Sequence, residues 1–549
     1  MTRAADNAPP VPDGLIIATV PVREEEERRR AISWTLTRRL LAYLWRYPRL
    51  QGVVIFQAVL VALLNSSVPL VVAEAIRWTI ERPDELKARW GMSVPQGLWL
   101  AFGAIATLAF LYVFLMGWRI YSVHRLTERV VFDLRHDLFA HVQRLDMAYF
   151  DRTKLGRILS RGTSDIGAMR NALAQVIPRT LISLLIMSFM FVLMVRADWV
   201  LALLLVGSAP VVLRLNEVFR ARMEEGYRSV QESYSRMTAN IAETVAGIRV
   251  TQGFAREGVN AGLFRALLMK HRANNMRAAV VHGLYLPVFD LCFQALVVAC
   301  LVVGAWRMTS GDMAVADLIG FLMYAGAFFG VANLLVDLYG TTLQAMAGAE
   351  RFFALMDQQP RVVQQAPLNA LPARGEPGAD PRGARVEFRG VSFAYDPGRP
   401  VLSDISFTAE PGQTVALVGH TGSGKTSVIN VACRLYEWQQ GAVLIDGLDL
   451  RSIHLPSLRA QTGIVSQDNF LFDGTVLENI RFARPDATEA QVVQACEALG
   501  CADILLGLRE GMATMVGERG SALSLGQRQL VCFARAMLAD PRLLILDEA

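Results

Sequence analysis

Residues 414–426 read Thr-Val-Ala-Leu-Val-Gly-His-Thr-Gly-Ser-Gly-Lys-Thr, an apolar run that leads into a glycine-rich loop. The run predicts a strand, and the residues from Ser427 onward predict a helix. Glycines allow a backbone to curl so that successive N–H groups and the helix N-terminus point at phosphate oxygens. The stretch therefore predicts a phosphate-binding loop between a strand and a helix of an α/β domain.

Each residue of this loop is a candidate contact for a nucleotide. The Lys425 ammonium is placed to reach the β and γ phosphates, and the Thr426 hydroxyl is placed to hold Mg²⁺. The candidate contacts are Gly419, His420, Thr421, Gly422, Ser423, Gly424, Lys425, Thr426 and Ser427.

The last residues of the sequence, Leu543–Ala549, predict a buried strand that delivers two carboxylates. Asp547 would bind the metal through water, and Glu548 would orient the attacking water or accept its proton. A strand end that simply meets solvent is the alternative interpretation. Together with the loop, the two carboxylates predict a site for magnesium and a nucleoside triphosphate.

Composition indicates that part of the chain lies in lipid. The chain has 549 residues, 53% of them hydrophobic, and its mean hydropathy is +0.32, which is too apolar for a soluble enzyme. The net charge of +5 is small and lies mostly as Arg beside apolar segments, which argues against a nucleic-acid partner. The six cysteines form no CxxC pair, so the spacing indicates no metal site or disulfide framework.

Apolar runs predict six membrane crossings, since about 20 helical residues span the hydrocarbon. The runs are Val53–Val72, Leu98–Trp118, Thr180–Val195, Trp199–Leu213, Gly283–Trp306 and Leu318–Val336. The third and fourth are separated only by Arg196-Ala197-Asp198, which predicts a tight helical hairpin. The intervening segments 119–179 and 214–277 are long and rich in Arg, so we expect them to be cytoplasmic continuations of the membrane helices.

The predicted order of domains follows from these shifts in composition. We expect a disordered cytosolic tail over residues 1–33, an amphipathic interfacial helix over 34–47 and an all-α polytopic membrane domain over 48–345. A linker rich in Pro, Gly and Ala over 346–383 should precede an α/β nucleotide-binding domain of the phosphate-loop type over 384–549.

The stretch Leu523-Ser524-Leu525-Gly526-Gln527 precedes a predicted helix, whose N-terminus offers a second anion site. With this signature, residues 35–549 resemble the ATP-binding cassette (ABC) exporters of the half-transporter type. The resemblance implies that Ser524, Gly526 and Gln527 close over ATP held by a second half-transporter, in a homodimer or heterodimer. It also implies that Tyr395 stacks on adenine and that Gln467 contacts Mg²⁺ and the attacking water. Tyr395 as a strand cap and Gln467 as a solvated loop residue are the alternatives.

The resemblance implies an ATPase that drives efflux of hydrophobic drug-like, lipid or peptide cargo across a bacterial plasma membrane by alternating access. A lipid flippase and a regulatory, non-catalytic half of a heterodimer are the alternatives. Within the fifth crossing, Asp290 is either a cargo contact or a structural acid paired with an Arg. The family also has a loop, a strand and a histidine after the second carboxylate, so we expect a truncated chain that binds ATP weakly and hydrolyses little.

Overall fold

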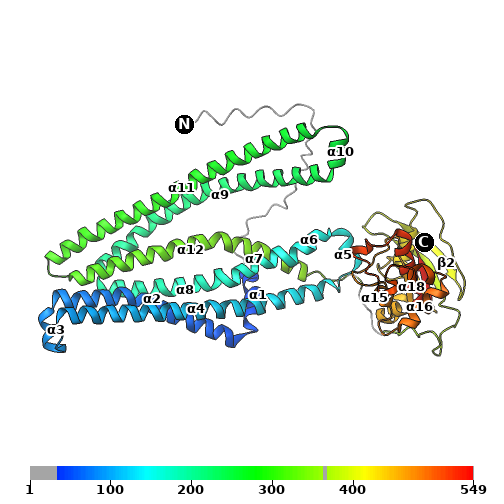
Figure 1. Cartoon of the computed structure of the whole chain (residues 1–549), viewed down its shortest axis with the longest axis horizontal. Helices are drawn as coiled ribbons and strands as arrows, with labels where there is room; N and C mark the ends of the chain where they lie inside the picture. Colours follow the sequence, from blue (N-terminus) through cyan, green and yellow to red (C-terminus); the bar gives the residue numbers. More distant parts are fainter. Residues whose placement is uncertain (1–33, 361, 363–367, 548–549) are drawn as a thin grey trace. The chain divides into compact units, whose positions relative to one another are not determined.

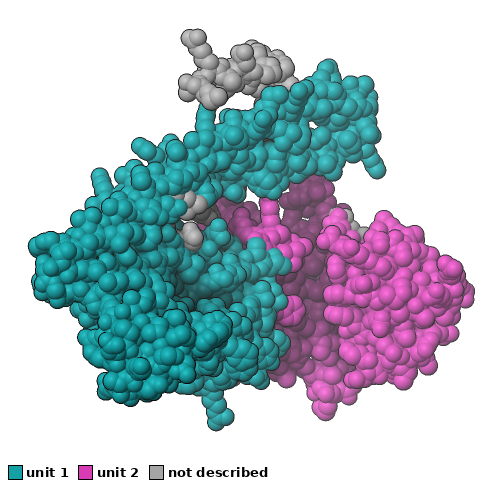
Figure 2. Space-filling view, turned by 60° about the vertical axis from the view of Figure 1, so that its left-hand side comes forward, with its two compact units in different colours: residues 1–136, 161–353 teal, residues 137–160, 354–549 magenta. Residues whose placement is uncertain are grey.

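The computed structural model describes residues 34–360, 362 and 368–547, and these residues divide into two compact units. Unit 1 comprises Met1–His136 and Arg161–Phe353, and unit 2 comprises Asp137–Ser160 and Ala354–Ala549 (Figure 2). The predicted tail over residues 1–33 lies outside the described residues.

Unit 1 is built from long helices (Figure 1), and six of them are long and apolar enough to cross a membrane, as predicted. These six candidate spans are Pro48–Glu81, Val94–Val142, Leu155–Ala197, Trp199–Ala246, Glu257–Thr309 and Val315–Met356. The helices of unit 1 are α1 (Trp34–Trp45), α2 (Pro48–Ile76), α3 (Pro83–Trp90), α4 (Val94–Val142), α7 (Ile166–Asn171), α8 (Ile177–Ala197), α9 (Trp199–Ala246), α10 (Ile248–Gly253), α11 (Glu257–Thr309) and α12 (Val315–Met356). Three π-helical turns interrupt the α-helical winding, namely η1 (Arg77–Glu81), η2 (Arg161–Asp165) and η3 (Ala172–Val176).

The predicted hairpin between the third and fourth spans is formed, and Asp198 is its only residue outside the two helices. The Asp198 carboxylate accepts hydrogen bonds from the backbone N–H groups of Val200 at 2.8 Å and Leu201 at 2.9 Å, which caps α9. Arg307 Nε also donates to this buried carboxylate, at 2.8 Å. The cap and the ion pair hold the turn together with the end of α11.

The membrane helices continue well past the length of a span. The α9 helix has 48 residues and α11 has 53, whereas about 20 residues cross the hydrocarbon. The fourth apolar run was predicted over Trp199–Leu213, with Pro210 inside it, and α9 continues through Pro210 to Ala246. A proline inside a membrane helix is tolerated when neighbouring helices compensate for the missing hydrogen bond, and α9 packs along α11 with α10 at the tip (Figure 1).

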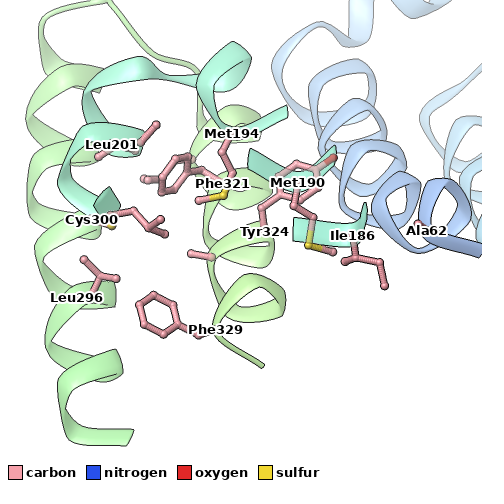
Figure 3. Close-up of a cluster of buried hydrophobic side chains, with 14 of the residues drawn as sticks. Ala62, Ile186, Met190, Met194, Leu201, Leu296, Cys300, Phe321, Tyr324 and Phe329 are labelled. Carbon is pink, nitrogen blue, oxygen red and sulfur yellow. The ribbon is translucent and has the colours of Figure 1, made fainter. Parts of the chain in front are cut away.

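A hydrophobic cluster at the centre of unit 1 holds the spans together (Figure 3). It includes Met190 and Met194 of α8, Leu201 of α9, and Phe321 of α12, all fully or almost fully buried. The aromatic side chains of α11 and α12 contribute to the same packing: the cluster includes Tyr285, Phe289, Phe321 and Tyr324, and Phe293 and Phe328 pack against it. By contrast, Asp290 of α11 is exposed and forms no ion pair among the described residues.

Unit 2 contains two sheets. A four-stranded antiparallel sheet has the order β2-β1-β3-β4, and a two-stranded parallel sheet pairs β5 with β6. The strands are β1 (Val386–Phe393), β2 (Leu402–Ala409), β3 (Gln440–Ile445), β4 (Leu448–Asp449), β5 (Thr462–Val465) and β6 (Leu543–Leu546). The α-helices are α5 (Met147–Arg152), α6 (Leu155–Ser160), α13 (Lys425–Ala432), α14 (Leu455–Ala460), α15 (Val476–Arg481), α16 (Glu489–Ala498), α17 (Ala502–Leu506) and α18 (Leu525–Leu538). Short 3₁₀ turns are η4 (Leu450–Ser452), η5 (Gly511–Ala513) and η6 (Glu518–Gly520).

The strand predicted over residues 414–418 is not formed. Residues 413–420 belong to no helix or strand, and the Val418 side chain is 92% exposed. A strand is stabilised by a neighbouring strand that pairs with it, and among the described residues none pairs with this segment. The strand predicted before Asp547, by contrast, is formed as β6. The prediction that it is buried is wrong, because Leu544 is 45% exposed and Leu546 is 47% exposed.

Candidate nucleotide-binding site

The phosphate loop leads directly into α13, as the sequence predicts. The Lys425 ammonium donates hydrogen bonds to the backbone carbonyls of Gly419 at 2.8 Å and His420 at 3.0 Å. The loop is therefore curled around the cation, and its N–H groups precede the N-terminus of an eight-residue helix. This arrangement concentrates positive charge and backbone donors at one point, which suits a phosphate chain.

Two glycines are required by the shape of the loop. Gly422 and Gly424 have φ angles of +86° and +92°, a region that residues with a Cβ rarely occupy. A Cβ on Gly424 would also lie 2.8 Å from the Leu402 side chain, so the loop is pressed against β2. A substitution at Gly424 would both strain the backbone and push the loop away from this strand.

The Tyr395 side chain forms hydrogen bonds with α13, the helix that follows the loop. Its hydroxyl lies 3.1 Å from the Ser427 hydroxyl, and Asn430 Nδ2 donates to it at 3.1 Å. The Ser427 side chain is buried in this contact, so any contact from Ser427 to phosphate would come from its backbone. The contact to Asn430 was not predicted, because nothing in a single sequence shows which residue of α13 faces Tyr395.

Two candidate metal ligands, Gln467 and Asp547, follow the ends of the two parallel strands β5 and β6. Strands β5 and β6 are parallel, and Asp547 N–H donates to the Val465 carbonyl at 2.9 Å, which continues the ladder by one residue. Gln467 follows β5 by two residues and is exposed. Because parallel strands end at the same edge, Gln467 and Asp547 emerge together. Glu548, the predicted catalytic carboxylate, lies outside the described residues.

The oxygen ligands in this unit are of the kind that Mg²⁺ prefers. Thr426 is exposed in the first turn of α13, and Asp547 and Gln467 provide carboxylate and amide oxygens. Magnesium is commonly held by one or two protein oxygens together with waters and the phosphates of the substrate. No cluster of three His, Cys, Asp or Glu side chains that could hold a metal occurs in the described ranges. The residues present thus fit a metal shared with a nucleotide rather than a metal held by protein alone.

The signature segment forms a capped helix start. The Ser524 hydroxyl accepts a hydrogen bond from Gln527 N–H at 3.3 Å, and the Gln527 side chain accepts one from Ser524 N–H at 2.9 Å. This capping box uses two backbone donors of α18. The backbone at Gly526 stays open, because a Cβ there would contact nothing within 4 Å. Within the described part of unit 2, no hydrogen bond joins Ser524–Gln527 to the phosphate loop.

Unit 2 also includes the short helix α5, which is fixed near Tyr395 by polar contacts. The Tyr436 hydroxyl donates a hydrogen bond to the Asp151 carboxylate, and Arg152 forms an ion pair with Asp396 at 2.6 Å. Burial, reinforced by Asp151, raises the pKa of Tyr436 above its ordinary value. The Tyr436 ring packs edge to face against Tyr395, with centroids 4.9 Å apart. The sequence analysis missed Tyr436, since a tyrosine after α13 carries no recognisable motif.

A pocket of about 540 Å³ lies beside these rings. Its lining includes Ala148, Tyr395 and Tyr436 but no residue of the phosphate loop. The pocket is therefore on the side of Tyr395 that faces α5, and adenine stacking on Tyr395 stays a prediction.

Comparisons with known proteins give consistent results over the two units. The family model described as "ABC transporter transmembrane region" matches residues 52–331, and the model described as "ABC transporter" matches residues 402–549. The "Uncharacterized ABC transporter ATP-binding protein YknV" of Bacillus subtilis is 35% identical over 432 residues, which cover 78% of this chain and 70% of that protein. The "Fatty acid ABC transporter ATP-binding/permease protein" of Mycobacterium bovis is 34% identical over 466 residues, 84% of this chain and 72% of that protein.

A solved structure shares the fold. The structure of a bacterial Atm1-family ABC exporter with ATP bound aligns with a TM-score of 0.72 at 23% identity, covering 91% of this chain and 86% of that one. At this identity, the likeness shows the fold of the chain.

Proposed function

Because the chain belongs to the ABC transporters, as an exporter half-transporter with ATPase activity coupled to transport, we propose that it moves hydrophobic drug-like, lipid or peptide cargo out of the cytoplasm or the inner leaflet. The observation that carries the proposal is the curled phosphate loop before α13, in one chain with six long apolar helices. The loop provides the nucleotide site and the helices provide the path through the bilayer.

We place the N-terminus and unit 2 in the cytoplasm of a bacterial cell, with the spans in the plasma membrane. The segments 119–179 and 214–277 are long and rich in Arg, whereas the turns at their opposite ends, such as Asp198, are short. Arg and Lys are concentrated on the cytoplasmic side of membrane proteins. The same assignment puts the phosphate loop where ATP is available.

In the proposed site, each residue keeps the role predicted from the sequence. Lys425 and the loop N–H groups bind the β and γ phosphates, and the Tyr395 ring packs on adenine. Thr426, Gln467 and Asp547 would hold Mg²⁺, which neutralises charge on the phosphates when bound. Gln467 and Glu548 orient the attacking water, and Glu548 accepts its proton.

We propose that the working form contains two half-transporters. The hydrogen bonds of Ser524 and Gln527 stay within α18, which leaves the open backbone at Gly526 for a phosphate held by another copy. The α9–α11 hairpin also exposes apolar side chains near its tip, with Val250 63% exposed and Phe254 75% exposed. Apolar side chains that are exposed close together mark an interaction surface, so a partner that covers them is favoured.

Within unit 2, α5 provides a route by which nucleotide binding can act on the membrane helices. Asp151 and Arg152 of α5 are bound to Tyr436 and Asp396, and Tyr436 packs on Tyr395, whose hydroxyl lies against Ser427. A shift of the phosphate loop would therefore reach α5 through one aromatic contact, between Tyr395 and Tyr436, and the hydrogen bonds on either side of it. We propose that this chain of contacts couples the ATP cycle to the spans.

The test is ATP-driven uptake of a hydrophobic dye into inverted membrane vesicles. Lys425→Ala should lower both ATPase activity and dye uptake by about 100-fold, since removal of one preorganised charge donor commonly costs that much. Lys87→Ala, which changes an exposed lysine of α3, should leave both rates unchanged. Uptake that survives Lys425→Ala would refute the proposal. Movement of a labelled phospholipid in the absence of dye uptake would favour a flippase.

A further inference from the structure

A buried arginine without a carboxylate partner lies at one end of the second span. Arg119 of α4 is 5% exposed and follows the apolar run that ends at Trp118. Its Nη2 donates to the Met116 sulfur at 3.3 Å, and within the described part of the chain its Nε has no hydrogen-bond partner. Among the described residues, Arg119 forms no ion pair.

Other polar groups surround this guanidinium. Gln57 of α2 is fully buried, and its Nε2 donates to the Ser122 hydroxyl of α4 at 3.1 Å while its Oε1 has no partner. Ser122 lies one helical turn from Arg119, on the same face of α4. Two further groups interact electrostatically with Arg119, namely the Tyr112 hydroxyl of α4, which favours its charge, and Arg179, exposed in the first turn of α8, which opposes it. Three helices thus bring two cations and a buried amide to one level of the membrane unit.

A buried guanidinium is costly unless a counter-charge and hydrogen bonds compensate for its lost hydration. A thioether sulfur is a weak acceptor and supplies no charge. Helix packing alone would be satisfied by Met or Leu at this position, and ionisable residues at membrane depth usually serve a ligand or a partner. Among the described residues no carboxylate pairs with Arg119, and the second cation raises the cost of leaving the charge uncompensated, which favours an anionic ligand here.

We propose that Arg119 and Arg179, with Gln57 beside them, bind the anionic headgroup of an amphiphile, as a carboxylate or a phosphate. The arginine fork matches both groups, because it can donate two parallel hydrogen bonds. Arg179 is exposed and meets the headgroup first, and Arg119 then holds it at the buried end. The neighbouring lipid-facing side of α4, with Phe110 and Phe114 more than half exposed, accommodates the apolar tail.

The level of the site fits such a ligand. Arg119 comes directly after its apolar run and Arg179 directly before the next one, so both lie at the same boundary of the hydrocarbon. On the proposed orientation this is the inner leaflet, where anionic lipids and amphiphilic cargo place their headgroups. The binding site does not depend on the proposed ATP-driven cycle, and the binding and stability measurements that test it are made without nucleotide; ATP is added afterwards only to tell cargo from a resident lipid.

The probes are oleate and phosphatidylglycerol, added to the full chain in nanodiscs of phosphatidylcholine, with thermal stability and direct binding as the readouts. Both probes should raise the melting temperature, whereas oleyl alcohol, which lacks the charge, should not. Arg119→Gln should weaken binding about 10- to 100-fold, the loss expected for charged hydrogen bonds. The matched control is Arg196→Gln, an exposed arginine at the opposite end of α8, which should bind as the wild type does.

A further variant keeps the test decisive. Arg119→Met removes the charge and keeps the volume, so it should fold without added anion and should lose the response to oleate. If Arg119→Met binds both probes as tightly as the wild type does, the proposal is overturned. Inorganic phosphate that binds as well as phosphatidylglycerol would overturn the requirement for an amphiphile. Oleate that leaves the site on ATP addition identifies the ligand as cargo, and a phospholipid that stays through turnover identifies a resident lipid; either result supports the site.

Discussion

Replacing Asp165 by alanine should destabilise the membrane unit, because this carboxylate joins two distant segments. It lies at the end of η2 with its side chain 3% exposed, and it accepts hydrogen bonds from Arg351 Nη2 of α12 at 2.5 Å and from Arg161 Nη1 at 2.9 Å. Removing one member of a buried ion pair costs about 3–5 kcal/mol. Arg351 is 37% exposed and can regain hydration, so we expect the lower end, about 3 kcal/mol.

The assay is a double-mutant cycle on the purified chain in detergent, with unfolding followed by tryptophan fluorescence. Asp165→Ala, Arg351→Ala and the double variant should give a coupling free energy above about 1.5 kcal/mol, well outside the additive range of about 0.5 kcal/mol. The matched control is Glu217→Ala, whose partner Arg214 is 78% exposed and whose loss should cost less than about 1 kcal/mol. A coupling energy below about 0.5 kcal/mol between Asp165 and Arg351 would refute the reasoning.

Three further changes test unit 2. Tyr436→Phe should weaken the attachment of α5 by about 1 kcal/mol and reduce stimulation of ATPase by cargo, with basal hydrolysis kept. Burial and Asp151 raise the pKa of Tyr436 in the folded chain. The Tyr436 hydroxyl therefore contributes fully to stability below the unfolded pKa of about 10, and this contribution is lost as the pH rises through the folded pKa. Melting curves measured over a pH series should show a smaller loss of stability at alkaline pH in Tyr436→Phe than in the wild type. Ser524→Ala should lower the free energy of unfolding by about 1 kcal/mol and abolish ATPase activity. Thr488→Ala, which removes the equivalent N-cap of α16, should lower stability by the same amount and keep ATPase activity. Burial raises the pKa of Cys433 to about 12, so maleimide should label it at neutral pH only after unfolding, and labelling of the folded chain would contradict its burial.

The membrane spans could be predicted from the sequence because a bilayer imposes a length and a polarity that composition reveals directly. The ends of the helices were harder to place, because α9 continues through Pro210 into a polar helical segment that is stabilised by its packing along α11. The capping residue Asp198 also forms an ion pair with Arg307, which is 109 residues away. Long-range pairs of this kind leave no pattern in a single sequence.

The candidate nucleotide site shows the same division. The loop before α13 and the strand β6 were predicted from local patterns, because glycine spacing and an apolar run with terminal acids are local chemistry. The pairing of Tyr436 with Asp151 joins residues 285 positions apart, and the buried Arg119 looked like an ordinary basic residue at the end of a span. The failed strand over residues 414–418 had the right composition, but a strand exists only where another one pairs with it.

The π-helical turn η3 determines the direction around the helix axis in which the Asp165 side chain points, and so whether it reaches α12. It lies between Asp165 and α8, and its backbone hydrogen bonds span one residue more than those of an α-helix do. Deleting one residue from this turn would leave a regular rod but would rotate everything before it by about 100° around the helix axis. The carboxylate would then point away from Arg351. A one-residue insertion or deletion in η3 should therefore leave the helix folded but turn its side chains away from the residues that they now contact.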